Sequence, residues 1–292
     1  MVRARDRAFT LPELLTVLAI LLVLASLMFP VFRAVRESAR KSACLAHFRQ
    51  GSLAMTLYLA DYDDRFMPAS YQPGEQANSR TDRTWVQLLL PYMRSFGVFQ
   101  CPSDYGRRPT LDATFDQDLV PGDTDSRYYT VSQRSDLGYN YLYLSPIVRS
   151  GSEPWMAATR LASTVSNPSN TIAFVDSVWA RDENGVPFGG GNYLVVPPCR
   201  YVRNGVQRVD TFNINQSQNI LYVPKKGWDV DNPNSALVYG GAWPWHNGRM
   251  NIGRLDGSVR AVSPQQLSAG CRVADDWGGD ITSPSAYVWD FN

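Results

Sequence analysis

The clearest pattern in the chain is one long apolar segment near the N-terminus. Residues 14–32 contain no charged side chain, and most positions are Leu, Val, Ile, Ala, Met or Phe. A helix needs about 20 such residues to cross the hydrocarbon core of a bilayer. The pattern therefore predicts a membrane-spanning helix, which we place at about residues 9–32.

The helical pattern continues beyond the apolar segment. Residues 31–61 contain no Pro, and the polar run at 61–68, which closes with Pro68, ends the helical pattern. We therefore predict one N-terminal helix over residues 9–61. Its apolar positions recur three and four residues apart, which predicts one buried face: Val31, Val35, Ala39, Ala43 and Ala46.

The rest of the chain predicts one globular domain over residues 62–292. Trp85, Leu88, Leu89 and Tyr92 fall on one face of a second, short helix at 85–93. Short strands are expected between turn residues at 138–144, 171–175, 193–196, 220–223 and 250–262. The predicted fold class is α+β, with the long pilin-like helix packed on an antiparallel β-sheet domain.

The final strand pair has a distinct turn signal. Asp256 and Gly257 lie between two runs of alternating apolar and polar residues. An Asp-Gly pair in that setting is a strong hairpin signal, and it predicts a two-residue turn with positive φ at Asp256.

Composition narrows the function classes. The net charge is +1, so the chain has no global attraction for phosphate, and we exclude nucleic acid as a main partner. The four cysteines include no Cys-x-x-Cys pair, which gives no support to zinc ribbons. Two histidines, His47 and His246, leave little material for histidine-based metal sites or a catalytic triad.

Charges around the apolar segment indicate its orientation. Arg3, Arg5 and Arg7 precede it against Asp6 alone, which favours a cytoplasmic location for residues 1–8. The bulk of the chain is then extracytoplasmic. Basic residues also follow the segment and weaken this argument without reversing it: Arg33, Arg36, Arg40 and Lys41.

Three kinds of N-terminal segment fit the apolar run. It could be a secretory signal, with Val23 and Ala25 before the cut, or an uncut signal anchor. Neither explains Glu13, because a carboxylate at the membrane edge costs on the order of 2 to 3 kcal/mol on insertion. Glu13 requires a cationic partner, which the third kind of segment supplies.

Residues 7–15, Arg-Ala-Phe-Thr-Leu-Pro-Glu-Leu-Leu, resemble the cleavage and methylation signal of type IV prepilins and type II secretion pseudopilins. The resemblance implies that prepilin peptidase removes a leader, residues 1–8, after Ala8 and methylates the new amino group of Phe9. The family usually has Gly where this chain has Ala8, and both residues are small. Pilins also commonly carry a proline near the position of Pro30.

The resemblance implies a structural subunit of a type IV pilus-like or type II secretion pseudopilus filament. Glu13 would pair with the Phe9 ammonium of a neighbouring subunit, and Pro30 would kink or locally melt the helix. The partners would be the peptidase, other pilin-like subunits, the assembly platform and the cytoplasmic membrane. The protein would be a single-pass protein of the inner membrane, and part of a filament or the cell surface after assembly.

A second resemblance involves the C-terminal hairpin. His246, nine further residues and then Asp256-Gly257 are similar to the His-X9-Asp-Gly region of a large group of bacterial prepilin-type proteins. We expect structural roles for both residues: Asp256 shapes the turn, and His246 ties the preceding loop to the hairpin region at 246–257. No Ser or Cys nucleophile accompanies them, which argues against catalysis. The chain is therefore expected not to be an enzyme. Further segments match the same group in order: 44–48, 62–63, 101–104, 138–141 and 167–171.

Disulfides are expected outside the cytoplasm, where thiols oxidise. Four cysteines allow three pairings, and we favour Cys44 with Cys101 and Cys199 with Cys271. The first bond would hold the helix to the domain, and the second would join late strands.

No cofactor is expected, although one acidic loop has the composition of a calcium site. Its spacing is not that of an EF-hand, and solvated acidic loops are common. The residues are Asp116, Asp118, Asp123 and Asp125.

Two alternatives to a filament subunit stay open. One is a membrane-anchored module that binds an extracellular ligand through acidic and aromatic side chains, with Trp243, Trp245, Trp277 and Trp289 as candidates, although core packing explains these equally well. The other is an anchored hydrolase, which would depend on His246 and Asp256.

Overall fold

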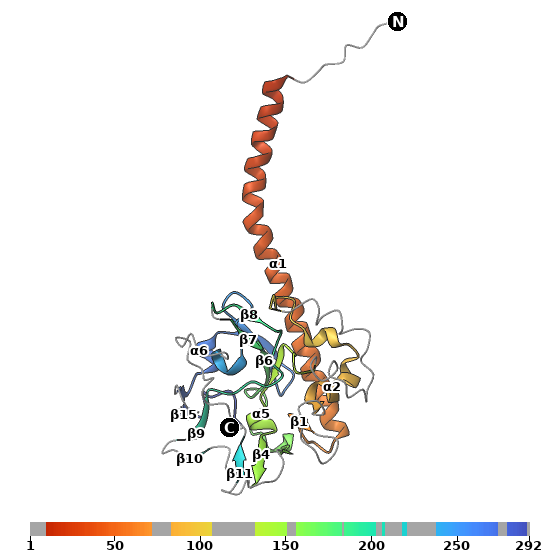
Figure 1. The fold of residues 1–292 in the computed structure, drawn as a ribbon, viewed down its shortest axis with the longest axis vertical. Helices are drawn as coiled ribbons and strands as arrows, with labels where there is room; N and C mark the ends of the chain where they lie inside the picture. The colour runs from red at the N-terminus through yellow and green to blue at the C-terminus, as the bar shows by residue number, and fades with distance from the viewer. Residues whose placement is uncertain are drawn as a thin grey trace.

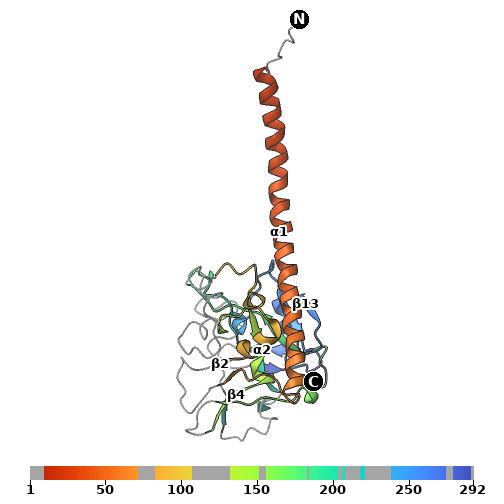
Figure 2. The ribbon, with the colours of Figure 1, turned by 90° about the vertical axis from the view of Figure 1, so that its right-hand side faces the viewer.

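A long helix projects from a globular body in a computed structural model of the chain (Figure 1). Helix α1, Leu11–Asp61, runs through 51 residues, and Figure 2 shows its outer half standing clear of the body. The structure describes residues 10–71, 83–106, 132–150, 156–182, 184–202, 206–207, 218–220, 238–273 and 279–290.

The two halves of α1 have different surroundings. In the outer half the apolar side chains are exposed, as Leu22 is at 70% and Phe29 at 60%. The inner half packs one face on the body. The helix passes through Pro30 without interruption, so the local melting predicted there is not present, and a kink stays a prediction. The buried residues of α1 are Cys44, Phe48, Gly51, Ser52, Ala54, Met55 and Tyr58. The predicted buried face, Val31, Val35, Ala39, Ala43 and Ala46, is wrong, because α1 packs on the body through the neighbouring face that begins at Cys44 and leaves these five residues exposed.

The inner half of α1 lies against an antiparallel four-stranded sheet with the order β13-β12-β6-β3. The helix approaches β12 closely at Gly253. A Cβ atom there would lie 2.6 Å from Ser52 Oγ, so glycine allows the contact. The α+β fold class, with a long helix and an antiparallel sheet, is confirmed. The strands are β3 (Leu137–Tyr139), β6 (Ile172–Asp176), β12 (Met250–Arg254) and β13 (Val259–Val262).

The hairpin at the end of the sheet forms as expected but with a different turn. Gly253 pairs with Val259, and the Arg254 N–H donates to Ser258 O, which leaves three residues in the loop. Gly257 has φ +83°, whereas Asp256 is not among the residues with positive φ. The predicted two-residue turn with positive φ at Asp256 is wrong, because the left-handed position of a three-residue loop falls on the glycine.

The remaining elements form further sheets and short helices around the core. A second four-stranded sheet has the order β10-β9-β15-β14, and Cys199 of β9 forms a disulfide with Cys271 of β14. The helical elements are α2 (Trp85–Met93), η1 (Phe96–Phe99), α5 (Tyr141–Leu144), η2 (Ala162–Thr164), η5 (Val238–Gly241) and α6 (Pro264–Leu267). The other strands are β1 (Ser70–Tyr71), β2 (Arg83–Thr84), β4 (Ile147–Ser150), β5 (Met156–Ala157), β7 (Ala180–Arg181), β8 (Pro187–Phe188), β9 (Cys199–Val202), β10 (Val206–Gln207), β11 (Gln218–Ile220), β14 (Cys271–Arg272) and β15 (Gly279–Ile281).

Not every predicted element has the predicted form. The short helix at 85–93 coincides with α2. The strand predicted at 138–144 is wrong in its second half, which forms α5. At 193–196 the structure has one isolated bridge, from Leu194 to Tyr139, instead of a strand.

Candidate functional site

Four metal-ligating side chains meet beneath the inner half of α1. Their ligand atoms all lie within 4.8 Å of one another, and all four residues are buried. Each comes from a different part of the fold, namely α1, the segment after η1, the end of β6 and the loop before β12. We call them the buried ligand cluster: Cys44, Cys101, Asp176 and His246.

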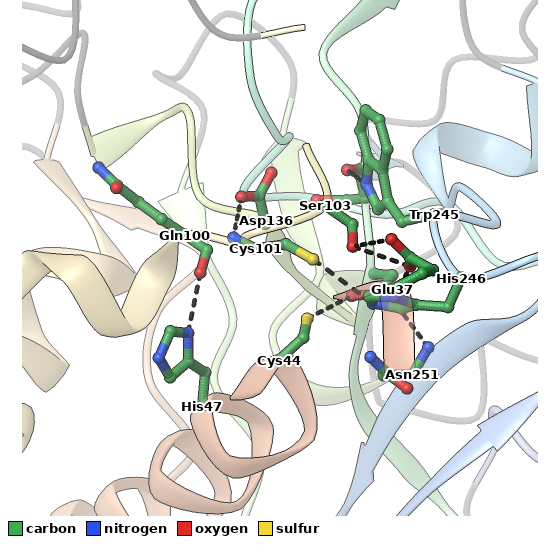
Figure 3. Close-up of polar contacts among 12 residues, drawn as sticks. Glu37, Cys44, His47, Gln100, Cys101, Ser103, Asp136, Trp245, His246 and Asn251 are labelled. Atoms are coloured by element: carbon green, nitrogen blue, oxygen red, sulfur yellow. Dashed lines mark hydrogen bonds and ion pairs between the residues drawn. The ribbon is translucent and has the colours of Figure 1, made fainter. Parts of the chain in front are cut away.

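Direct contacts link the members of the cluster. Cys44 Sγ lies 3.3 Å from Asp176 Oδ1 and donates to it. Cys101 Sγ lies 3.4 Å from His246 Nε2. The same nitrogen is 3.5 Å from Asp176 Oδ2. In Figure 3 the sulfur atoms of Cys44 and Cys101 point to the same side, toward the imidazole of His246.

Surrounding groups orient the cluster. His246 Nδ1 lies 3.0 Å from Glu37 Oε1, and Ser103 Oγ donates to the same carboxylate at 2.9 Å (Figure 3). The Asn251 backbone N–H donates to Asp176 Oδ2 at 2.6 Å. The Cys101 backbone N–H donates to the Asp136 carboxylate. The side chains are therefore held from more than one direction.

Burial controls the protonation of these groups. Desolvation raises the pKa of Cys44 and of Asp176 well above their usual values. Desolvation also lowers the pKa of His246, although the hydrogen bond to Glu37 opposes this change. Burial therefore shifts each of these groups toward its neutral form.

The N-terminus of α1 carries the second candidate site. Glu13 Oε2 accepts hydrogen bonds from the Thr10 backbone N–H at 2.8 Å and from Thr10 Oγ1 at 2.7 Å. This contact caps the first turn of the helix. Ala8 and Phe9, the predicted cleavage residues, lie outside the described residues.

The outer half of α1 is long and apolar enough to cross a membrane, and none of its most apolar stretch is buried in the body. Soluble core helices pass the same test of length and composition, but they bury their side chains. The exposed surface here therefore requires lipid or protein to cover it.

Comparison with known families settles the nature of this N-terminus. Residues 3–29 match the model of the prokaryotic N-terminal methylation motif. The chain carries a prepilin-type N-terminal motif. Residues 33–98 also match a family described as a protein of unknown function (DUF1559). No curated protein and no solved structure matches the chain.

The structure forms one of the two predicted disulfides. The bond between Cys199 and Cys271 is present, as predicted. Cys44 and Cys101 are instead free thiols, so the second predicted pairing is not formed in this structure. Their sulfur atoms face Asp176 and His246 respectively.

The structure separates His246 from Asp256. The two residues lie at opposite ends of β12, and the Asp256 carboxylate accepts from the Ser258 backbone N–H at 2.9 Å as a turn residue. The arrangement thus lacks the direct contact that an Asp-oriented catalytic histidine needs. His246 is oriented by Glu37 instead.

The remaining candidate binding residues are the tryptophans and the acidic loop. Trp289 is fully buried, and Trp245 is 7% exposed with its Nε1 donating to Ser177 O. Trp243 lies beside Trp245 at 6.3 Å between ring centroids. Trp277 and the four aspartates of the predicted calcium loop, Asp116, Asp118, Asp123 and Asp125, lie outside the described residues.

Sequence reasoning did not single out Asp176 or Glu37. Asp176 directly follows the strand predicted at 171–175, and Glu37 lies on the predicted N-terminal helix, so neither position looked unusual. The available signal was the resemblance of segments 44–48 and 101–104, which contain Cys44 and Cys101. It did not show which side chains would meet.

Proposed function

We propose that this prepilin-like protein is a structural subunit of a type IV pilus-like or type II secretion pseudopilus filament. Prepilin peptidase would cut it after Ala8, and α1 would pack into the filament core. The observation that carries the proposal is the exposed apolar half of α1 directly after a matched methylation motif.

The environment of Glu13 supports assembly through α1. Among the residues that the structure describes, its carboxylate accepts from Thr10, at the exposed tip of the helix. In a bundle of such helices this charge would be buried, and burial of a lone carboxylate is costly. The ammonium of Phe9 from a neighbouring subunit would neutralise it and provide a register for packing.

The body would then lie outside the cytoplasmic membrane, with α1 as its only tie to the bilayer before assembly. The partners would be the peptidase, the assembly platform and other pilin-like subunits. The contribution of this chain would be structural rather than catalytic, and the separation of His246 from Asp256 supports that view.

Processing tests the proposal first. The full chain would be extracted from membranes with and without the peptidase, and its intact mass and N-terminal sequence measured. We expect a mature chain that begins at Phe9, with a methyl group on its amine. A chain that begins after Ala25, or that keeps its leader in the presence of the peptidase, would overturn the proposal in favour of an anchored binding module.

Assembly tests the role of Glu13. Glu13→Ala should still be cut but should fail to enter sheared filaments, because its helix offers no partner for the Phe9 ammonium. Thr10→Val is the matched control, since it removes the hydroxyl contact with Glu13 and keeps the carboxylate. Equal incorporation of Glu13→Ala and wild type would contradict assembly through this pair.

A further inference from the structure

We propose that the buried ligand cluster binds one Zn²⁺ ion that fastens α1 to the sheet. This inference does not depend on the filament role. It rests on the convergence of two thiols, a carboxylate and an imidazole at a buried point.

The distances within the cluster fit a tetrahedral ion. Zinc bonds of about 2.3 Å to sulfur and about 2.0 Å to nitrogen or oxygen place neighbouring ligand atoms about 3.3 to 3.8 Å apart. Three contacts in the cluster, at 3.3, 3.4 and 3.5 Å, fall within this range, the first to Oδ1 and the third to Oδ2 of Asp176, and all four ligand atoms lie within 4.8 Å of one another. Small movements of the side chains would therefore suffice to admit the ion.

The donor set selects the metal. Two thiolates with an imidazole and a carboxylate suit zinc, whereas calcium and magnesium prefer oxygen ligands alone. Four protein ligands complete a tetrahedron and leave no position for water or substrate. The site is therefore structural in type rather than catalytic.

The contact with Glu37 prepares His246 to bind. When Nδ1 carries the proton that Glu37 accepts, Nε2 presents its lone pair to the cluster. A carboxylate that orients a histidine in this way is a regular feature of zinc sites. Two residues of α1, Glu37 and Cys44, would thus act on one ion from the same helix.

Charge balance also favours a cation. Cys44 and Cys101 as thiolates and Asp176 as a carboxylate bring three negative charges, which Zn²⁺ reduces to one. Binding would release the protons of the thiols, and of the carboxyl group where it is protonated, to solvent.

A Cys44–Cys101 disulfide is the competing outcome. The structure forms a disulfide between Cys199 and Cys271 yet leaves these two cysteines as thiols. Each sulfur also contacts a different non-sulfur ligand, Asp176 or His246. A disulfide would remove both sulfur contacts and leave His246 with Glu37 and Asp176 with the Asn251 N–H, whereas a cation would use all four ligand groups.

The test uses the full chain, purified in detergent without reductant or chelator and dialysed after incubation with Zn²⁺. Elemental analysis should find about one zinc per chain. Thiol titration of the unfolded protein in chelator should find two thiols, from Cys44 and Cys101. Zinc below a tenth of an equivalent, or a peptide mass that joins these cysteines by a disulfide, would overturn the proposal.

Variants assign the ligands. Cys101→Ser and His246→Gln should each lower zinc retention at least tenfold. His47→Gln is the matched control, because His47 lies one turn from Cys44 and contacts Gln100 O at 2.8 Å but is not in the cluster. Zinc retained in full by His246→Gln, or lost equally by His47→Gln, would contradict the assignment.

A measurement on the wild-type protein tests the site even if the variants fail to fold. Co²⁺ exchanged into the site should show the intense visible absorption of a tetrahedral ion and thiolate charge-transfer bands in the near ultraviolet. A cobalt spectrum without thiolate bands would refute binding at this cluster, whatever the variants do.

Discussion

His246 Nδ1 lies 3.0 Å from Glu37 Oε1, and this contact joins the loop before β12 to the part of α1 that enters the body. The two residues are 209 positions apart in the chain. His246 therefore faces α1, while Asp256 and Gly257 form the turn at the far end of β12.

Glu37→Ala should reduce zinc affinity about 10- to 100-fold, because His246 would lose the group that fixes its tautomer and ring orientation. Competition with a chromophoric chelator would measure this change. Ser103→Ala is the control, since it removes the other contact of Glu37 and leaves the imidazole contact intact. An equal loss in both variants would point to a general disturbance of the loop rather than to orientation of His246.

Asp176→Asn should have opposite effects with and without zinc. In the metal-free protein burial holds the pKa of Asp176 well above its unfolded value, and nearby Asp136 adds to this effect. Ionisation of such a group costs stability as pH rises above its unfolded pKa. Metal-free Asp176→Asn should thus gain stability relative to wild type between about pH 4 and pH 7.

Zinc should reverse that order at pH 7, because the wild-type carboxylate becomes a ligand and the amide is a poor substitute. Thermal unfolding of both proteins in chelator and in zinc would show the reversal. His246 and the two thiols are present in both proteins, so their titration largely cancels in the comparison. The same sign in both conditions would contradict ligation by Asp176.

Cys199→Ser together with Cys271→Ser should destabilise the body by about 4 kcal/mol, since the bond closes a loop with a sequence separation of 72. Chemical unfolding without reductant would measure the loss. Zinc content at low temperature should remain near that of the wild type, because neither cysteine belongs to the buried ligand cluster. Unchanged stability would mean that the bond contributes little to the folded state.

Gly253→Ala should destabilise the contact between α1 and the sheet by about 1 to 3 kcal/mol, because the new methyl group would meet Ser52 Oγ at 2.6 Å. Adding Ser52→Ala should restore most of the loss, since the next atom, Phe48 O, is 3.5 Å away. Ser52 Oγ is buried and makes no hydrogen bond among the described residues, so its removal costs little by itself. A double variant no better than Gly253→Ala would argue against this contact as the cause.

Local patterns predicted α1 and α2 because the interactions that form a helix lie within a few residues. The apolar run corresponds to the outer half of α1 and the pattern at 85–93 to α2, whereas the spacing of apolar residues along 31–46 did not show which face of α1 is buried. The strand predicted at 138–144 failed after Asn140. That side chain donates to Ile172 O and Trp289 O, contacts that no local pattern contains, and α5 begins at the next residue.

The candidate site was harder to predict for the same reason. Cys44 and Asp176 are 132 residues apart, and Cys101 and His246 are 145 apart. Metal motifs are recognised in a sequence when their ligands are close together, as in paired Cys-x-x-Cys segments. Here the tertiary fold assembles the ligands, so the sequence supplied the residue types but not their proximity.

The unbroken course of α1 has a mechanical consequence. At about 1.5 Å per residue, its 51 residues form a rod about 75 Å long that begins in the apolar segment and ends at Asp61 beneath the body. A pull on the outer end of such a rod reaches the sheet at Glu37 and Cys44 before it reaches the rest of the packed face. Under tension, the contacts of α1 with the end of β6 and with the loop before β12 would therefore carry the load first. The strength of these contacts would determine whether the body stays attached to α1.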